Sequence, residues 1–255
     1  MVPHTSDGRV MFAIPWHGHT LVGTTDTPIE KATLEPRAFD EEVEFILQTA
    51  AQYLDKPPSR KDVLSIYTGI RPLVKAGEGE STAALSRDHT IRIEPSGFIT
   101  VTGGKWTTYR HMAEDCVNQA AMLGRLEERA CVTRNLNVHG FHQNAMKFGD
   151  LEVYGADAPA ITDLMRTEPA LAERLDPELP YVAAQVAWAA RKEMARTLDD
   201  VLSRRMRALI LNAAAALRMA PRAAAILALE LGRDEAWRDA QVKEFAILAE
   251  GYQLK

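Results

Sequence analysis

The sequence predicts an α+β protein in which a sheet-rich first half precedes an all-helical second half. Short runs of β-branched and aromatic residues, typical of strands in an antiparallel or mixed sheet, recur through the first 125 residues. From about residue 158 onward, apolar residues recur at the three- and four-residue spacing of packed helices. This periodicity weakens between residues 125 and 147. We therefore expect two domains, 1–125 and 126–255.

Composition and charge narrow the class of protein. The chain has 255 residues, of which 46% are hydrophobic and 25% charged, a soluble globular profile. A net charge of −5 without a basic stripe argues against nucleic-acid binding. The two cysteines, Cys116 and Cys131, form no Cys-x-x-Cys pair, so we expect reduced thiols and no metal site.

The sequence also gives an expectation of the cellular compartment in which the protein resides. Residues 1–7 lack the basic and apolar regions of a secretory signal, and no uncharged apolar run approaches twenty residues. We therefore expect a cytoplasmic protein. Peripheral attachment to the cytoplasmic membrane and formation of a homodimer are left open.

The first elements read as a hairpin followed by a helix. Residues 10–16 and 19–25 are strand-like, with His17-Gly18 as the turn between them. Asp40 is the expected N-cap of a helix that ends before two prolines at 57 and 58. Residues 62–67 alternate in the manner of a further strand.

The most informative stretch joins a strand to a helix through Gly103-Gly104. Residues 97–102 are strand-like, and apolar residues at helical spacing follow until Gly124. Two glycines allow a sharp turn, and the helix start offers unpaired N–H groups and the positive end of its dipole. Lys105 and the hydroxyls of Thr107 and Thr108 reinforce that charge. The stretch predicts an anion site, with an ordinary strand–turn–helix connection as the alternative.

Two arginines are placed where they can bind a second anion. Arg71 is fixed between Gly69 and Pro72, and Arg87 lies beside Asp88 after the loop that follows. They bracket this loop and can converge on one phosphate, whereas a structural ion pair is the simpler alternative for each. His17, His19 and His89 are the histidines expected on the side of this pocket. Their spacing does not indicate a metal site, and we assign them no catalytic role.

The second half predicts a helical bundle without visible chemistry. We expect short helices at 158–165 and 170–175 and longer ones at 181–196 and 199–217. A further helix should start at Pro221 and end near Gly232, with a last one at 235–250. The charged segment 191–205 is either a solvated helix face or the place where Arg204-Arg205 caps a domain contact.

Five of these stretches resemble the FAD-dependent glycerol-3-phosphate dehydrogenases and oxidases. They occur in the family's order over nearly the whole chain, at 23–26, 69–73, 86–90, 103–110 and 191–205. The resemblance implies that the helix after the double glycine points at FAD, with Gly103, Gly104, Lys105, Trp106 and Thr107 as cofactor-binding residues. It also implies that Lys105 is catalytic, stabilising negative charge at the reduced flavin, and that Arg71 and Arg87 bind substrate.

The family's Gly-x-Gly-x-x-Gly nucleotide-binding motif is absent from this sequence. We therefore expect a C-terminal portion of such an enzyme, which by itself is inactive and does not retain FAD. The implied reaction oxidises sn-glycerol 3-phosphate to dihydroxyacetone phosphate and passes electrons to quinone. Alternatives are an oxidase that uses oxygen, a related amine or amino-acid oxidase, and a non-enzymatic interaction module. No residue of this chain is assigned as the general base.

Overall fold

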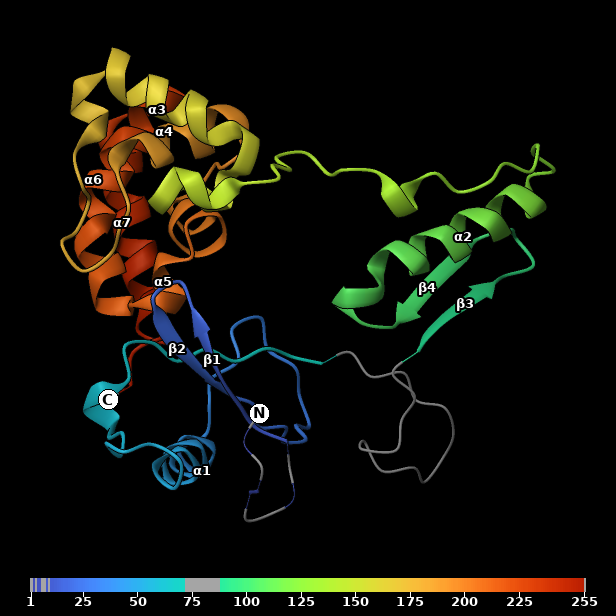
Figure 1. Ribbon diagram of the computed structural model, residues 1–255, viewed down its shortest axis with the longest axis horizontal. Coiled ribbons are helices and arrows are strands. Elements are labelled where there is room, and N and C mark those ends of the chain that lie inside the picture. Colours follow the sequence, from blue (N-terminus) through green and yellow to red (C-terminus); the bar gives the residue numbers. More distant parts are fainter. Residues whose placement is uncertain (1, 3, 6–7, 9, 72–87, 255) are drawn as a thin grey trace. The chain divides into compact units, whose positions relative to one another are not determined.

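The computed structural model describes residues 2, 4, 5, 8, 10–71 and 88–254. Contacts divide the chain into two compact units, one formed by Met1–Gly69 with Gly140–Lys255 and the other by Ile70–His139. Both contain helices, and each contains one antiparallel hairpin, so the expected α+β class is confirmed (Figure 1). The domain boundary near residue 125 stays a prediction.

The first unit begins with the expected hairpin. Strand β1 (Phe12–Trp16) pairs antiparallel with β2 (His19–Gly23), and Trp16 lies opposite His19. The two turn residues, His17 and Gly18, have φ angles of 47° and 75°. Positive φ at both positions gives the turn whose twist matches that of the flanking strands. The hairpin prediction is therefore confirmed.

Helix α1 (Asp40–Ala51) follows, with its cap shifted by one residue from the expectation. Phe39 is the N-cap, and Asp40 is the first helical residue. The carboxylate of Glu42 accepts the backbone N–H of Phe39 at 3.2 Å, which satisfies one of the donors at this helix start. Val43, Thr49 and Ala50 form the buried face of α1.

The strand expected at 62–67 is wrong. A 3-10 turn covers Arg60–Asp62, and the residues after it are extended without a strand partner. Their hydrogen bonds go instead to the ends of helices in the same unit. The N–H of Ile66 donates to the carbonyl of Tyr252 at 2.9 Å, and the carbonyl of Leu64 accepts the N–H of Ala213 at 3.0 Å. An alternating pattern indicates extended backbone but does not say which partner satisfies it.

The rest of the first unit is helical, as expected. Its α-helices are α3 (Ala158–Thr167), α4 (Ala183–Lys192), α5 (Ala208–Leu211), α6 (Ala213–Leu231) and α7 (Glu235–Ala249). Helical turns of other types cover Ala145–Asp157, Pro169–Ala172 and Asp200–Arg205. These elements gather in one bundle (Figure 1). The main hydrophobic core of the unit lies within it.

Several helix boundaries differ from the expectation: the helix expected at 181–196 ends at Lys192, and a 3-10 turn over Pro169–Ala172 replaces the helix expected at 170–175. Pro221 lies inside α6, not at its start, and residues 199–217 contain a break at Asn212. Asn212 caps α6, its side-chain oxygen accepting the N–H of Ala215 at 3.0 Å. Fully buried alanines on α4 and α6 let these helices pack closely. This packing keeps α6 helical through a proline that removes one backbone hydrogen bond.

The second unit is small. Strand β3 (His89–Ile93) pairs antiparallel with β4 (Ile99–Gly103), and helix α2 (Tyr109–Leu123) follows. Helix α2 ends at Gly124, as expected. No described residue of this unit is buried. In the described part of the chain, no helix combines the length and apolar character needed to span a bilayer.

Candidate functional site

The double glycine forms a turn that other residues cannot adopt without strain. Strand β4 ends at Gly103, and Gly103 and Gly104 have φ angles of 74° and 76°. A Cβ on Gly104 would lie 2.5 Å from the sulfur of Met112 and 3.2 Å from Cβ of His89. Glycine at 104 is therefore required by the backbone angle and by packing against the protein itself.

The residues after the glycines form a 3-10 turn (Trp106–Thr108) before α2 begins. The Thr108 hydroxyl donates to the carbonyl of Lys105 at 3.0 Å and accepts the N–H of Lys105 at 3.3 Å. This hydroxyl is therefore used within the turn, in contrast to the expectation that it reinforces an anion site. Among the described residues, the N–H groups of Trp106 and Thr107 have no acceptor. With the exposed Lys105 side chain, they present donors on one short turn.

Trp106 adds an aromatic surface beside these donors. Its ring stacks on Tyr109, with centroids 5.4 Å apart and planes at 26°, and 86% of the residue is exposed. Gly103, Gly104, Lys105, Trp106 and Thr107, which were expected to form one site, therefore lie in one continuous turn. A planar ligand with an anionic or acceptor edge suits such a surface.

A pair of histidines around one carboxylate lies on the same unit, and sequence reasoning missed it. Nε2 of His89 is 2.8 Å from Oδ2 of Asp115, and Nε2 of His111 is 3.6 Å from the same oxygen. The two imidazole rings meet edge to face at 5.8 Å. Only the i,i+4 spacing of His111 and Asp115 on α2 signalled this arrangement in the sequence.

Arg110, the last residue of the glycine-rich motif, is an internal contact of the unit. Its guanidinium donates to Glu114 at 2.6 Å and to the hydroxyl of Thr133 at 3.4 Å. The hydrogen bond from Arg110 lowers the pKa of Glu114. The contact attaches α2 to the segment that follows it.

The structure describes only one of the two arginines that are expected to bind substrate. Arg71 is exposed at the end of a described stretch, and Arg87 lies outside the described residues. Their convergence on one phosphate therefore stays a prediction. Across the parts of the chain that the structure describes, no cluster of three or more His, Cys, Asp or Glu side chains is suited to a metal ion.

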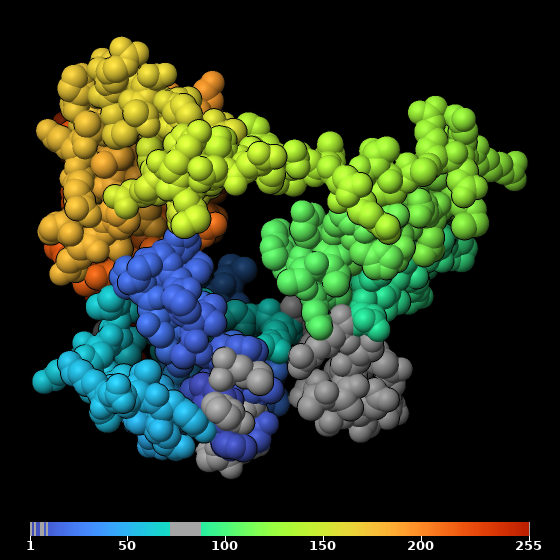
Figure 2. Space-filling model, in the orientation of Figure 1, coloured from blue at the N-terminus to red at the C-terminus, as the bar shows by residue number. Residues whose placement is uncertain are grey.

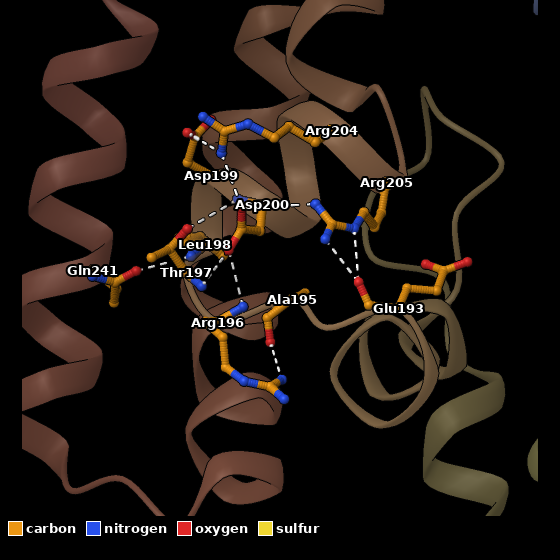
Figure 3. A network of polar contacts seen from close by, with 10 residues as sticks. All are labelled: Glu193, Ala195, Arg196, Thr197, Leu198, Asp199, Asp200, Arg204, Arg205 and Gln241. Carbon is orange, nitrogen blue, oxygen red and sulfur yellow. Dashed lines mark hydrogen bonds and ion pairs between the residues drawn. The ribbon is translucent and has the colours of Figure 1, made fainter. Parts of the chain in front are cut away.

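Within the charged segment 191–205, residues 196–200 form a helix cap (Figure 3). Oδ2 of Asp200 accepts the N–H groups of Arg196 and Thr197 at 3.0 and 3.1 Å, and the Thr197 hydroxyl accepts the N–H of Asp200 at 3.1 Å. The N–H of Leu198 donates to the side chain of Gln241 on α7 at 2.8 Å. This reciprocal cap fixes the start of the helical turn at Asp200–Arg205.

Three arginines complete this network. Arg204 contacts Asp199 and Asp200 at 2.5 and 3.1 Å. Arg205 donates to the carbonyl of Glu193 at 2.7 and 3.1 Å, and Arg196 donates to the carbonyl of Ala195 at 2.8 Å (Figure 3). Arg196 also donates to the carbonyl of Ala190 at 3.1 Å. Arg205 therefore binds a backbone carbonyl, and Arg204 pairs with two carboxylates. Both contacts lie within the helical part of the first unit.

Comparison with known proteins identifies the family. Residues 99–238 match the family model described as the C-terminal domain of alpha-glycerophosphate oxidase, and residues 1–110 match that of FAD dependent oxidoreductases. The chain belongs to the FAD-dependent glycerol-3-phosphate dehydrogenase family. Members of this FAD-dependent dehydrogenase family are flavoprotein oxidoreductases.

Named members of the family are similar over nearly all of this chain. The probable mitochondrial glycerol-3-phosphate dehydrogenase of Caenorhabditis elegans is 40% identical over 95% of the chain and 36% of its own length. The mitochondrial enzyme SDP6 of Arabidopsis thaliana is 36% identical over 90% of the chain and 41% of its length. The chain thus spans about two fifths of the length of these dehydrogenases.

A solved structure agrees with this assignment. Glycerol-3-phosphate dehydrogenase from Bacillus halodurans, determined in complex with FAD, superposes with a TM-score of 0.78 at 26% identity. The similarity covers 98% of this chain and 52% of that dehydrogenase.

Proposed function

We propose that this chain supplies the flavin-facing and substrate-facing elements of an FAD-dependent glycerol-3-phosphate dehydrogenase. The reaction would oxidise the carbinol at C2 of sn-glycerol 3-phosphate to the ketone of dihydroxyacetone phosphate, with loss of two electrons and two protons. The observation that carries the proposal is the turn at Gly103–Thr107, which presents N–H donors, a lysine and an aromatic ring in a member of this family.

The residues of this turn fit the flavin portion of FAD. The donors at Trp106 and Thr107 and the ammonium group of Lys105 suit the electron-rich pyrimidine edge of the ring. When bound, FAD supplies the acceptor for a hydride, which carries both electrons. Lys105 would hold positive charge beside the ring as negative charge develops there. The ADP portion would be held by a Gly-x-Gly-x-x-Gly segment outside this sequence.

Arg71 and Arg87 would bind the substrate's phosphate. A guanidinium presents a planar fork of donors that matches phosphate oxygens in two-point contacts. Binding the phosphate at a fixed place would orient the C2 hydrogen toward the flavin, so that the arginines contribute orientation as well as affinity.

Activity of an assembled enzyme tests the proposal. The chain is expressed together with the nucleotide-binding half of a similar dehydrogenase, and reduction of a quinone analogue is followed with sn-glycerol 3-phosphate. We expect FAD-dependent turnover that either half alone lacks and that is lost with glycerol as substrate, because glycerol has no phosphate for the arginines. Assembly with bound FAD but without turnover would contradict the proposal.

Oxygen is the second candidate acceptor, because the family model over residues 99–238 is named for an oxidase. The two acceptors are separated by measuring hydrogen peroxide in the same assay without quinone. Stoichiometric peroxide would indicate an oxidase, and its absence together with quinone reduction would indicate a dehydrogenase.

A further inference from the structure

The first unit contains a cavity that the proposed dehydrogenase chemistry does not use. Its volume is 390 Å³, and it lies between the turn of the β1–β2 hairpin and the helical bundle of the same unit. In Figure 2 the blue hairpin meets the yellow-green residues of this unit at that place. Its lining includes several polar and charged residues, and a cavity of this size can hold a small polar ligand.

Arg207 provides a positive charge in the lining of this cavity. It is partly buried, precedes α5 and has a φ angle of 61°. Its backbone carbonyl accepts the N–H groups of Ile210 and Leu211, which fixes the left-handed conformation. Within the described part of the chain, the Arg207 guanidinium makes no hydrogen bond or ion pair, although its charge acts on the partly buried carboxyl group of Glu193. The donors of a partly buried guanidinium that makes no direct hydrogen bond are available to an anionic ligand.

Tyr154 provides a hydroxyl donor in the same wall. Only 8% of this residue is exposed, and its oxygen accepts the side-chain N–H of Gln185 at 3.2 Å. The orientation of the Gln185 amide is fixed, because its oxygen accepts the N–H of Val182 at 2.9 Å. The Tyr154 hydroxyl therefore accepts from Gln185, and its own proton remains available to a ligand.

The tyrosines stay neutral donors over the physiological range. Burial raises the pKa of Tyr154, and burial raises the pKa of Tyr181, a second tyrosine of the lining, to about 12. On the opposite side, burial lowers the pKa of His17, and the positive charge of Arg207 lowers it further. The inner wall therefore presents hydrogen-bond donors and positive charge.

Three exposed carboxylates, Asp150, Glu152 and Glu178, also line the cavity. These carboxylates can accept hydrogen bonds from hydroxyl or amino groups of a ligand. We propose that this cavity binds a small anion carrying a hydroxyl or amino group, a phosphate monoester or a hydroxy acid, whose anionic end pairs with Arg207 and Tyr154. This site is formed by residues of the first unit alone and does not rest on the dehydrogenase proposal.

Calorimetric titration of the full chain with inorganic phosphate and with lactate tests the proposal. We expect saturable binding of at least one of them. Arg207→Gln should weaken it about tenfold or more, because a charge-assisted hydrogen bond is lost, and Tyr154→Phe about threefold. Arg166→Gln is the matched control, since this arginine is 74% exposed on α3, away from the cavity. Preference for phosphate or for lactate would identify the anionic group.

Two measurements keep the test decisive. The thermal midpoint of each variant shows whether it folds, and the NMR titration of His17 shows where the anion binds, because an anion beside Arg207 raises the pKa of His17. Lys105→Met should retain full binding, which separates this site from the proposed flavin site. The proposal is overturned by unchanged affinity in folded Arg207→Gln and Tyr154→Phe, or by the absence of saturable binding of either anion at millimolar concentrations.

Discussion

Nε2 of His89 on β3 lies 2.8 Å from Oδ2 of Asp115 on α2. This contact ties the hairpin to the helix on both sides of the double-glycine turn, because His89 also lies opposite Gly103 in the strand register. The unit that contains it has no buried described residue, so polar contacts of this kind carry an unusual share of its stability.

We expect Asp115→Asn to loosen this unit locally. Replacing the carboxylate by an amide weakens a hydrogen bond that contributes about 0.5–1.5 kcal/mol, which corresponds to amide exchange in α2 about two- to twelvefold faster. Hydrogen exchange measured by mass spectrometry checks this. His111→Ala is the control, because His111 lies 3.6 Å from Asp115 and is 61% exposed. Equal exchange rates in Asp115→Asn and the parent would show that the pair does not hold the hairpin.

In the assembled enzyme, Arg71→Ala should raise the KM for glycerol 3-phosphate far more than it changes flavin content. A charge-assisted phosphate contact contributes about 1.5–3 kcal/mol, so the expected increase is about tenfold or more. Arg87→Ala should behave in the same way. Steady-state kinetics with flavin quantified by absorbance make the comparison. Parental kinetics in both variants would favour structural ion pairs for these arginines.

Lys105→Met should lower the reduction potential of bound FAD. The substitution keeps most of the side chain's length and removes its positive charge, so the negative charge of the reduced ring is less stabilised. A loss of about 1–2 kcal/mol corresponds to roughly 20–45 mV for a two-electron couple. Spectroelectrochemical titration of the assembled enzyme measures this shift. An unchanged or higher potential with FAD fully bound would leave Lys105 a substrate-binding or structural residue.

Arg218→Met should destabilise the helical part and make it more sensitive to acid. Arg218 binds both oxygens of Asp176 at 2.7 and 3.0 Å, and only 3% of the Asp176 side chain is exposed. Removing the cation leaves this carboxylate buried without its charged partner, at a cost of about 1–3 kcal/mol. Urea unfolding measures that cost. Arg222→Met is the control, because Arg222 pairs with Glu173 on the surface, where the expected loss is below about 1 kcal/mol.

The pH dependence of this pair has a definite sign. The hydrogen bond from Arg218 lowers the pKa of Asp176 below its unfolded value of about 3.9. The pair therefore stabilises the fold fully above that value, and the contribution is lost as the pH falls through the folded-state pKa. In Arg218→Met the pKa of Asp176 rises, so acid unfolding should begin at higher pH. An unchanged acid midpoint would show that the pair is not coupled to folding.

Local patterns predicted the elements whose hydrogen bonds are local. The first hairpin, strand β4 and helix α2 follow from strand-like runs, turn residues and helical spacing close together in the sequence. The segment 62–67 was misread because its backbone partners, including Tyr252, are distant in sequence. Pro221 was misread as a helix start because packing of α6 against α4 and α7 outweighs the local preference of proline.

The candidate sites show the same contrast between contacts that are local in sequence and contacts between distant residues. The turn from Gly103 to Thr107 was identified because its residues are contiguous in a motif. The pairing of His89 with Asp115 spans 26 positions and depends on how β3 packs on α2. The cavity at Arg207 joins a hairpin turn to helices more than a hundred residues later, and nothing in the local sequence around Arg207 distinguishes it from a helix-capping arginine.

The exposed apolar side chains of the smaller unit give any assembly reaction a characteristic heat signature. Trp106, Val117 and Met122 are 86%, 64% and 76% exposed. A polypeptide that covers them removes apolar surface from water, so association should show a negative heat-capacity change and be driven by entropy near room temperature. Such association weakens on cooling. Mixing this chain with a nucleotide-binding half should therefore give more complex at 25 °C than on ice.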